Sequence, residues 1–160
     1  MAICILKSNK QLGVNFILTP ERYNPRRRMS IDNEDTILMS EIVEIVNDII
    51  TKKQAQGKSI IQINTSDAMG GYLNINSEVN DSINSNKKIL RKGDVIISRL
   101  RPYLRQVAYV DEDRKEILGA STEFFVIRAR NNESIAYLVP FLLSQYFFIT
   151  INRIIHFRIN

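Results

Sequence analysis

Three arginines and a tyrosine follow a short apolar run near the middle of the chain. The stretch "VIISRLRPYLRQ" begins as a β-strand and then presents Arg99, Arg101, Tyr103 and Arg105. No carboxylate stands among them, so the guanidinium groups either remain solvated or meet an anion. Guanidinium groups match phosphate oxygens and the O6/N7 edge of guanine, and a tyrosine can stack on a sugar or cap a sheet edge. The stretch therefore predicts a nucleic-acid contact, with a solvated strand end as the plain alternative.

Other candidate DNA contacts lie before and after this stretch. The cations Lys87, Lys88 and Arg91 precede it on an expected approach loop. Polar side chains that could read base edges are Asn64, Thr65 and Ser66, after the apolar "IIQI", and Ser121 and Thr122, which are expected to open the "EFFVIRA" strand. Arg26, Arg27 and Arg28 are either a further contact or a polar arm.

The residues that most catalytic sites require are scarce. His156 is the only histidine and Cys4 the only cysteine, so no Cys/His zinc spacing can be written. Cys4 is a nucleophile or, more simply, a small apolar residue. No glycine-rich phosphate loop is present, and the adjacent acids 111–113 are typical of a solvated turn. We expect no catalytic residue, no metal and no cofactor. A nuclease built on carboxylates and a lysine stays open as an alternative.

Length and composition fit one folded domain over residues 1–160. The chain is 44% hydrophobic and 24% charged, with a net charge of +5, which favours a polyanionic partner. No basic segment precedes the first apolar run, as a secretory signal would require. The longest apolar tract is interrupted by Pro140 and is too short to span a membrane. We expect a soluble, cytoplasmic protein.

Most expected elements are strands, and the one long helix comes late. Alternating or apolar runs predict strands at 59–65, 72–76, 94–98, 106–110 and 123–129, and a helix at 135–154. Loops are expected at 54–59 and 77–91. A turn at 66–72 would carry one helical turn capped by Ser66 or Asp67. Ile42, Val46, Ile49 and Ile50 fit a helical face, while residues 42–46 could instead form a strand. This order predicts an α+β domain with a mostly antiparallel sheet.

The succession of these motifs resembles the target recognition domain of type I restriction-modification specificity subunits. The resemblance covers roughly residues 22–145 through "ERYNP", "EIVEIV", "IIQINTSDAMGGYL", "KILRKGDVIISRLRPYLRQVAYV", "GASTEFFVIRA" and "YLVPFLLS". It implies that "EIVEIV" is a strand after a brief turn at 39–41, in a compact domain around a curved, largely antiparallel sheet.

The resemblance also implies a function without chemistry of its own. Such a domain reads one half of a bipartite target in double-stranded DNA. Modification (methylase) subunits bring S-adenosylmethionine, and a restriction subunit brings ATP and cleavage. A module that only occupies the methylase is the remaining alternative.

Two departures from the family pattern stand out. The chain ends at "INRIIHFRIN", where the family continues into a long helix, so we expect a lone or truncated domain with weak binding alone. Arg105 stands where a glycine is common, so the turn there is expected to differ or to add a phosphate contact.

Overall fold

The computed structural model describes residues 37, 39–75, 78–145 and 147. All of them belong to a compact unit spanning Ile37–Asn160. The expectations for Cys4, Arg26, Arg27, Arg28 and His156, and for the helix beyond residue 147, lie outside the described residues.

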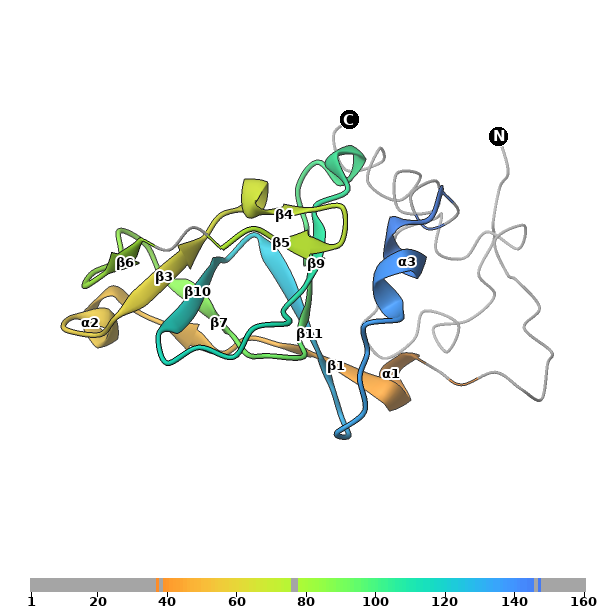
Figure 1. Ribbon diagram of the computed structural model, residues 1–160, viewed down its shortest axis with the longest axis horizontal. Helices are drawn as coiled ribbons and strands as arrows, with labels where there is room; N and C mark the ends of the chain where they lie inside the picture. The colour runs from red at the N-terminus through yellow and green to blue at the C-terminus, as the bar shows by residue number, and fades with distance from the viewer. Residues whose placement is uncertain (1–36, 38, 76–77, 146, 148–160) are drawn as a thin grey trace, which may run out of the picture. The chain divides into compact units, whose positions relative to one another are not determined.

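Short strands dominate the described part of the chain (Figure 1). The strands are β1 (Val43–Val46), β2 (Ile49–Ile50), β3 (Ile60–Ile63), β4 (Ala68–Met69), β5 (Tyr72–Leu73), β6 (Val79–Asn80), β7 (Lys87–Leu90), β8 (Val95–Ser98), β9 (Val107–Tyr109), β10 (Ile117–Ser121) and β11 (Phe124–Ala129). The helices are α1 (Met39–Ile42), α2 (Lys52–Ala55), the 3-10 turns η4 (Thr65–Asp67) and η5 (Pro102–Leu104), and α3 (Leu138–Leu143).

These strands form two larger sheets and one hairpin. One sheet has the order β1-β11-β8-β9, the other β2-β7-β10-β3-β6, and β4 pairs with β5. All pairings are antiparallel except that of β10 with β3. The predicted α+β class, the mostly antiparallel pairing and the late helix are confirmed. The strands are, however, divided between two main sheets.

The core lies on both faces of these sheets because neighbouring strand residues point to opposite sides. Ile96, Phe124 and Leu118 belong to a central cluster that both sheets share. On its other face, the four-stranded sheet packs Val95 and Ile127 against Leu138 of α3. The five-stranded sheet packs Ile60 against Ala55 and Ile83 in the same way. Each sheet therefore buries apolar residues on both of its faces.

Two glycines close the hairpin between β4 and β5. Gly70 and Gly71 both have positive φ, at 63° and 95°, as a two-residue hairpin between paired strands requires. Gly71 also donates its N–H to the Val107 carbonyl and accepts the N–H of Tyr109, which joins the hairpin to β9. The hairpin is thereby attached beside the loop that follows β8.

Several element predictions are confirmed and others are wrong. Segment 43–46 is a strand, as the resemblance implied, although the turn before it is one turn of helix. The loops expected at 54–59 and 77–91 are interrupted by the end of α2 and by β6 and β7. The short helical turn near residue 66 begins after Asn64, whose N–H donates to Asp67 at 2.7 Å, and neither Ser66 nor Asp67 is its cap.

Candidate nucleic-acid interface

Four segments that are distant in the sequence meet at one end of the two sheets. Because β3 and β10 are parallel and Ile63 pairs with Ala120, the residues that follow these strands are neighbours. Lys87 at the start of β7 pairs with Ser121 at the end of β10. The Arg99 N–H, just past β8, donates to the Glu123 carbonyl at 2.9 Å. We call this end the strand-end surface; it comprises Asn64, Thr65, Ser66, Lys87, Lys88, Arg99, Ser121 and Thr122.

Arg99 is held on this surface by two contacts. Its guanidinium donates to the Thr122 carbonyl at 3.2 Å and lies 5.5 Å from the centre of the Phe125 ring. A guanidinium over an aromatic face is attracted by the ring quadrupole. Arg99 is exposed and, within the described residues, has no ion pair with an acid. The geometry leaves its positive charge available to an external anion.

Lys87 and Lys88 differ from the prediction in their placement. They begin β7 and are only 7% and 5% exposed, so an approach loop is the wrong description. The aliphatic stems of both lysines pack against small residues of β10. Gly119 lies so close to Lys87 that a Cβ added at Gly119 would be only 3.2 Å from the Lys87 Cβ. Lys88 pairs with Ala120. Small residues on β10 therefore make room for lysine stems.

The environment of Lys88 is unfavourable to its charge. Burial, and then the neighbouring charge of Arg99, lower the pKa of Lys88 from its usual 10.5. No carboxylate of the described residues pairs with it. An anion close to both groups would offset this repulsion.

The arginine loop, residues 99–106, leaves the sheets after Ser98. The predicted end of the strand at Ser98 is confirmed. Beyond Ser98 the chain bends, and Arg101 has φ of 48°, so Arg99 and Arg101 do not lie on one extended segment. Arg101, Tyr103 and Arg105 are exposed. Arg105 has φ of 50°, which explains why a glycine would suit this position.

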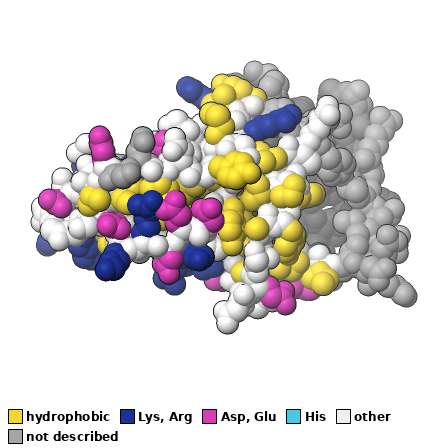
Figure 2. Space-filling model, in the orientation of Figure 1, with side chains coloured by type: hydrophobic (Ala, Val, Ile, Leu, Met, Phe, Trp, Pro, Cys, Tyr) yellow, Lys and Arg dark blue, Asp and Glu magenta, His cyan; other side chains and the backbone are white. Residues whose placement is uncertain are grey.

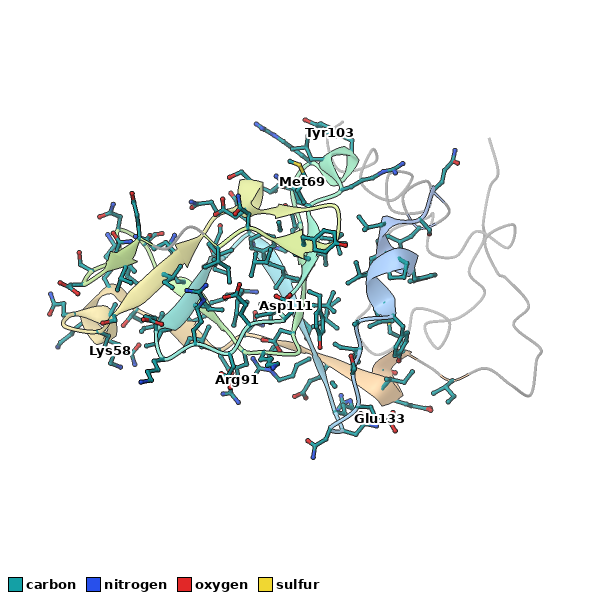
Figure 3. All side chains as sticks on the ribbon, viewed as in Figure 1. Lys58, Met69, Arg91, Tyr103, Asp111 and Glu133 are labelled. Carbon is teal, nitrogen blue, oxygen red and sulfur yellow. The ribbon has the colours of Figure 1, made fainter. Side chains whose placement is uncertain are left out.

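Arg91 is displaced from the group predicted for it. It follows β7 at the end opposite Lys87, and its guanidinium lies 3.3 Å from the Asp48 carboxylate. Figure 3 shows Arg91 and Tyr103 on opposite sides of the molecule. The sequence pattern did not distinguish the two ends of β7, because that strand was not predicted.

Nearby, Asp94 is 1% exposed and accepts two hydrogen bonds from Arg128, each at 2.8 Å. Arg128 also donates to Asp48 at 2.9 Å. The hydrogen bonds to Asp94, followed by the bond to Asp48, raise the pKa of Arg128 despite its partial burial. Asp48 and Asp94 occupy connections between the two sheets, so this Asp48–Arg128–Asp94 network is structural.

Ser121 and Thr122 require a smaller correction. Ser121 ends β10, and Thr122 lies in the turn before β11, so they do not open the "EFFVIRA" strand. Phe125 and Gly119 were missed by the sequence reasoning. The alternation of β11, in which Phe124 is buried and Phe125 exposed, is the signal that could have identified Phe125.

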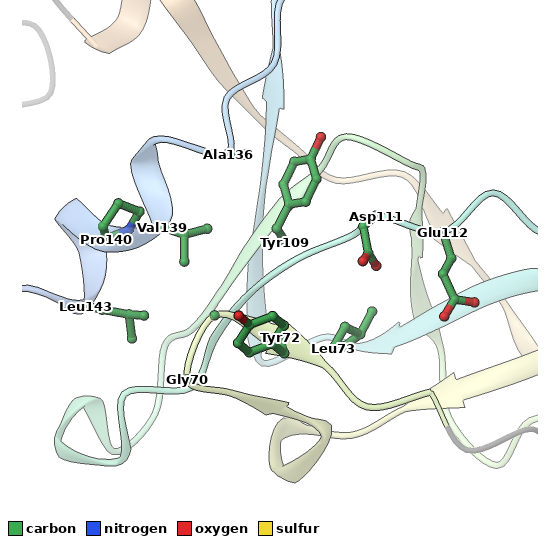
Figure 4. Close-up of a pocket in the computed structure, with 11 residues that line it drawn as sticks. Gly70, Tyr72, Leu73, Tyr109, Asp111, Glu112, Ala136, Val139, Pro140 and Leu143 are labelled. Atoms are coloured by element: carbon green, nitrogen blue, oxygen red, sulfur yellow. The ribbon is translucent and has the colours of Figure 1, made fainter.

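A separate pocket of about 500 Å³ lies between the β4–β5 hairpin, β9 and α3. Figure 4 shows Tyr72, Tyr109 and Leu143 around it, with Asp111 and Glu112 on one side. Glu112 forms an ion pair with Arg114. Among the described residues, no group of three or more His, Cys, Asp or Glu side chains could hold a metal ion.

In the part of the chain that the structure describes, no helix is both long and apolar enough to cross a membrane.

Comparison with known proteins finds a similarity in fold to solved structures. No protein-family model matches the chain, and no curated protein matches it significantly. The fold is similar to that of a chain in a structure described as the basis of complex assembly and conformational transition of the type I R-M system. The two chains are 22% identical with a TM-score of 0.52, over 68% of this chain and 28% of the other. This chain therefore matches less than a third of the length of its neighbour, and the two share a fold.

Proposed function

We propose that this chain is a DNA-recognition domain of a type I restriction-modification system, without catalytic activity of its own. The observation that carries the proposal is the convergence of Asn64–Ser66, Lys87, Lys88, Arg99 and the Ser121–Thr122 pair at one end of the sheets. The likeness to a chain of a type I R-M complex supports the same assignment.

The mechanism that we propose divides the contacts by chemistry. Lysines and arginines bind phosphates and fix the position of the domain, while polar side chains on the strand-end surface read base edges. Asn64 and Thr122, both exposed, are suited to base edges. Lys88 and Arg99 are suited to a phosphate because both are cations of the strand-end surface and neither has an acid partner among the described residues.

In this proposal the domain reads one half of a bipartite target. A modification subunit that binds S-adenosylmethionine and a restriction subunit that uses ATP would be its partners, and this chain would hold neither cofactor.

The test is duplex binding measured by fluorescence anisotropy at several salt concentrations. We expect the logarithm of the binding constant to fall linearly with the logarithm of the salt concentration, with a slope of about −0.9 for each phosphate contacted. Arg99→Ala should weaken binding and make the slope less steep by about 0.9. Arg91→Ala is the matched control, because it removes the same charge from the opposite side of the molecule.

Selection from a random duplex library then tests sequence reading. Equal weakening by Arg99→Ala and Arg91→Ala would indicate a merely basic protein. Failure to bind any duplex would refute the proposal.

A further inference from the structure

The arginine loop carries a second chemistry beside its cations. Leu100 is 50% exposed, Tyr103 61% and Leu104 43%, so three large apolar side chains project between Arg99, Arg101 and Arg105. Figure 2 shows apolar side chains beside basic ones along the upper edge of the molecule, where η5 and β4 lie in Figure 1.

The loop is rigid in its construction. Its base is closed by the Ser98 N–H donating to the Gln106 carbonyl at 2.9 Å. The Ser98 hydroxyl donates to the Leu100 carbonyl at 2.9 Å and accepts the Leu100 N–H at 3.2 Å. The Leu104 N–H donates to the Arg101 carbonyl at 2.9 Å. These hydrogen bonds hold the backbone that carries the exposed apolar side chains.

Backbone strain marks both sides of η5. Arg101 and Arg105 have φ of 48° and 50°, and they are the only non-glycine residues of the described chain with positive φ. Such conformations cost free energy and concentrate at functional sites. A loop that only connects two strands needs neither two strained residues nor exposed apolar side chains, so the combination points to a function of the loop.

We infer that the arginine loop is a wedge that enters a base step and kinks the duplex, an inference that rests on the DNA-binding function proposed above. Leu100 and Leu104 would enter between bases, Tyr103 would stack, and the flanking arginines would hold the phosphates on either side. Proteins that kink DNA insert apolar side chains in this manner and bear the cost of unstacking. The positive charges of Arg99 and Arg101 favour DNA over a protein as the partner of the loop, because neither arginine has an acid partner among the described residues.

The test compares two probes that differ only in their ease of kinking. One is a short mixed-sequence duplex, and the other is the same duplex with a single-nucleotide gap at its centre. Because the gap removes much of the unstacking cost, we expect the parent chain to bind the gapped probe roughly tenfold more tightly, or more.

Two kinds of variant separate the wedge from the phosphate contacts. In Leu100→Ala/Leu104→Ala, and in Tyr103→Ala alone, the preference should fall toward equal affinity while the salt slope stays unchanged. Arg101→Gln should weaken binding to both probes and retain the preference. Ile45→Ala, which truncates an exposed apolar side chain on β1, is the control, and thermal melting checks folding throughout.

The outcomes distinguish the wedge from the proposed function. Salt-dependent binding of the parent without preference for the gapped probe would refute the wedge and leave DNA recognition intact. Failure to bind either probe would refute both. A Leu100→Ala/Leu104→Ala variant that keeps the preference would refute the wedge, and if the parent self-associates and this variant does not, the apolar side chains belong to a protein interface.

Discussion

Burial, and then the charge of Arg99, lower the pKa of Lys88 below 10.5, so we expect its charged form to destabilise the folded chain at neutral pH. We expect Lys88→Met to raise the free energy of unfolding by about 1 kcal/mol and to weaken duplex binding, a trade-off common at functional sites. Since the folded pKa lies below 10.5, Lys88 loses its proton first in the folded state as the pH rises. The advantage of Lys88→Met should therefore shrink toward pH 10.5. Urea unfolding at several pH values measures this, and a variant less stable than the parent at neutral pH would contradict it.

Arg101 offers a second residue-scale test, because its left-handed backbone favours glycine. Arg101→Gly should raise the free energy of unfolding by up to about 1 kcal/mol, since relief of strain outweighs the entropy that glycine adds to the unfolded chain. Arg99→Gly is the comparison; it has no such strain to relieve and also loses the contacts with Thr122 and Phe125, so it should destabilise. Equal losses in the two variants by urea unfolding would show that Arg101 is not strained.

At the scale of elements, the Asp48–Arg128–Asp94 network joins the two sheets. Asp94→Ala leaves Arg128 partly buried without its main partner, which should cost about 3–5 kcal/mol of unfolding free energy. Arg91→Ala breaks only an exposed pair with Asp48 and should cost less than about 1 kcal/mol. Urea unfolding of both variants measures the difference, and a loss below about 1 kcal/mol for Asp94→Ala would show that the sheets do not depend on this network.

Alternation along the sequence predicted the strands that bury apolar residues, and it failed where polar residues are buried by their stems. The segment "IIQI" and the run before Ser98 were predicted correctly because apolar side chains mark them. Strand β7 was missed because Lys87 and Lys88 look solvated until Gly119 and Ala120 are placed opposite them. The grouping of Asn64, Lys87 and Ser121 could not be predicted from the residues, since it depends on sheet order and register.

For the whole molecule, we expect that the purified chain with magnesium or manganese neither cuts nor methylates DNA. The sequence holds one histidine, one cysteine and no glycine-rich phosphate loop, which leaves few ways to assemble a catalytic site. Incubation with plasmid and with S-adenosylmethionine, followed by gel and mass analysis, tests this. Stoichiometric metal-dependent cleavage that survives repurification would assign the chain to the nucleases.

The Asp48–Arg128–Asp94 network and the strand-end surface share no residue. Substitutions that change which DNA the surface binds consequently leave the network between the sheets intact. Substitutions that strengthen the network do not change which DNA is bound. At its exposed positions, Asn64 and Thr122 among them, such a surface can drift toward new targets over evolutionary time with little demand on stability, unlike Lys88. A laboratory library randomised at Asn64, Thr65 and Thr122 should accordingly yield mostly folded members, ready to be sorted by the sequences they prefer.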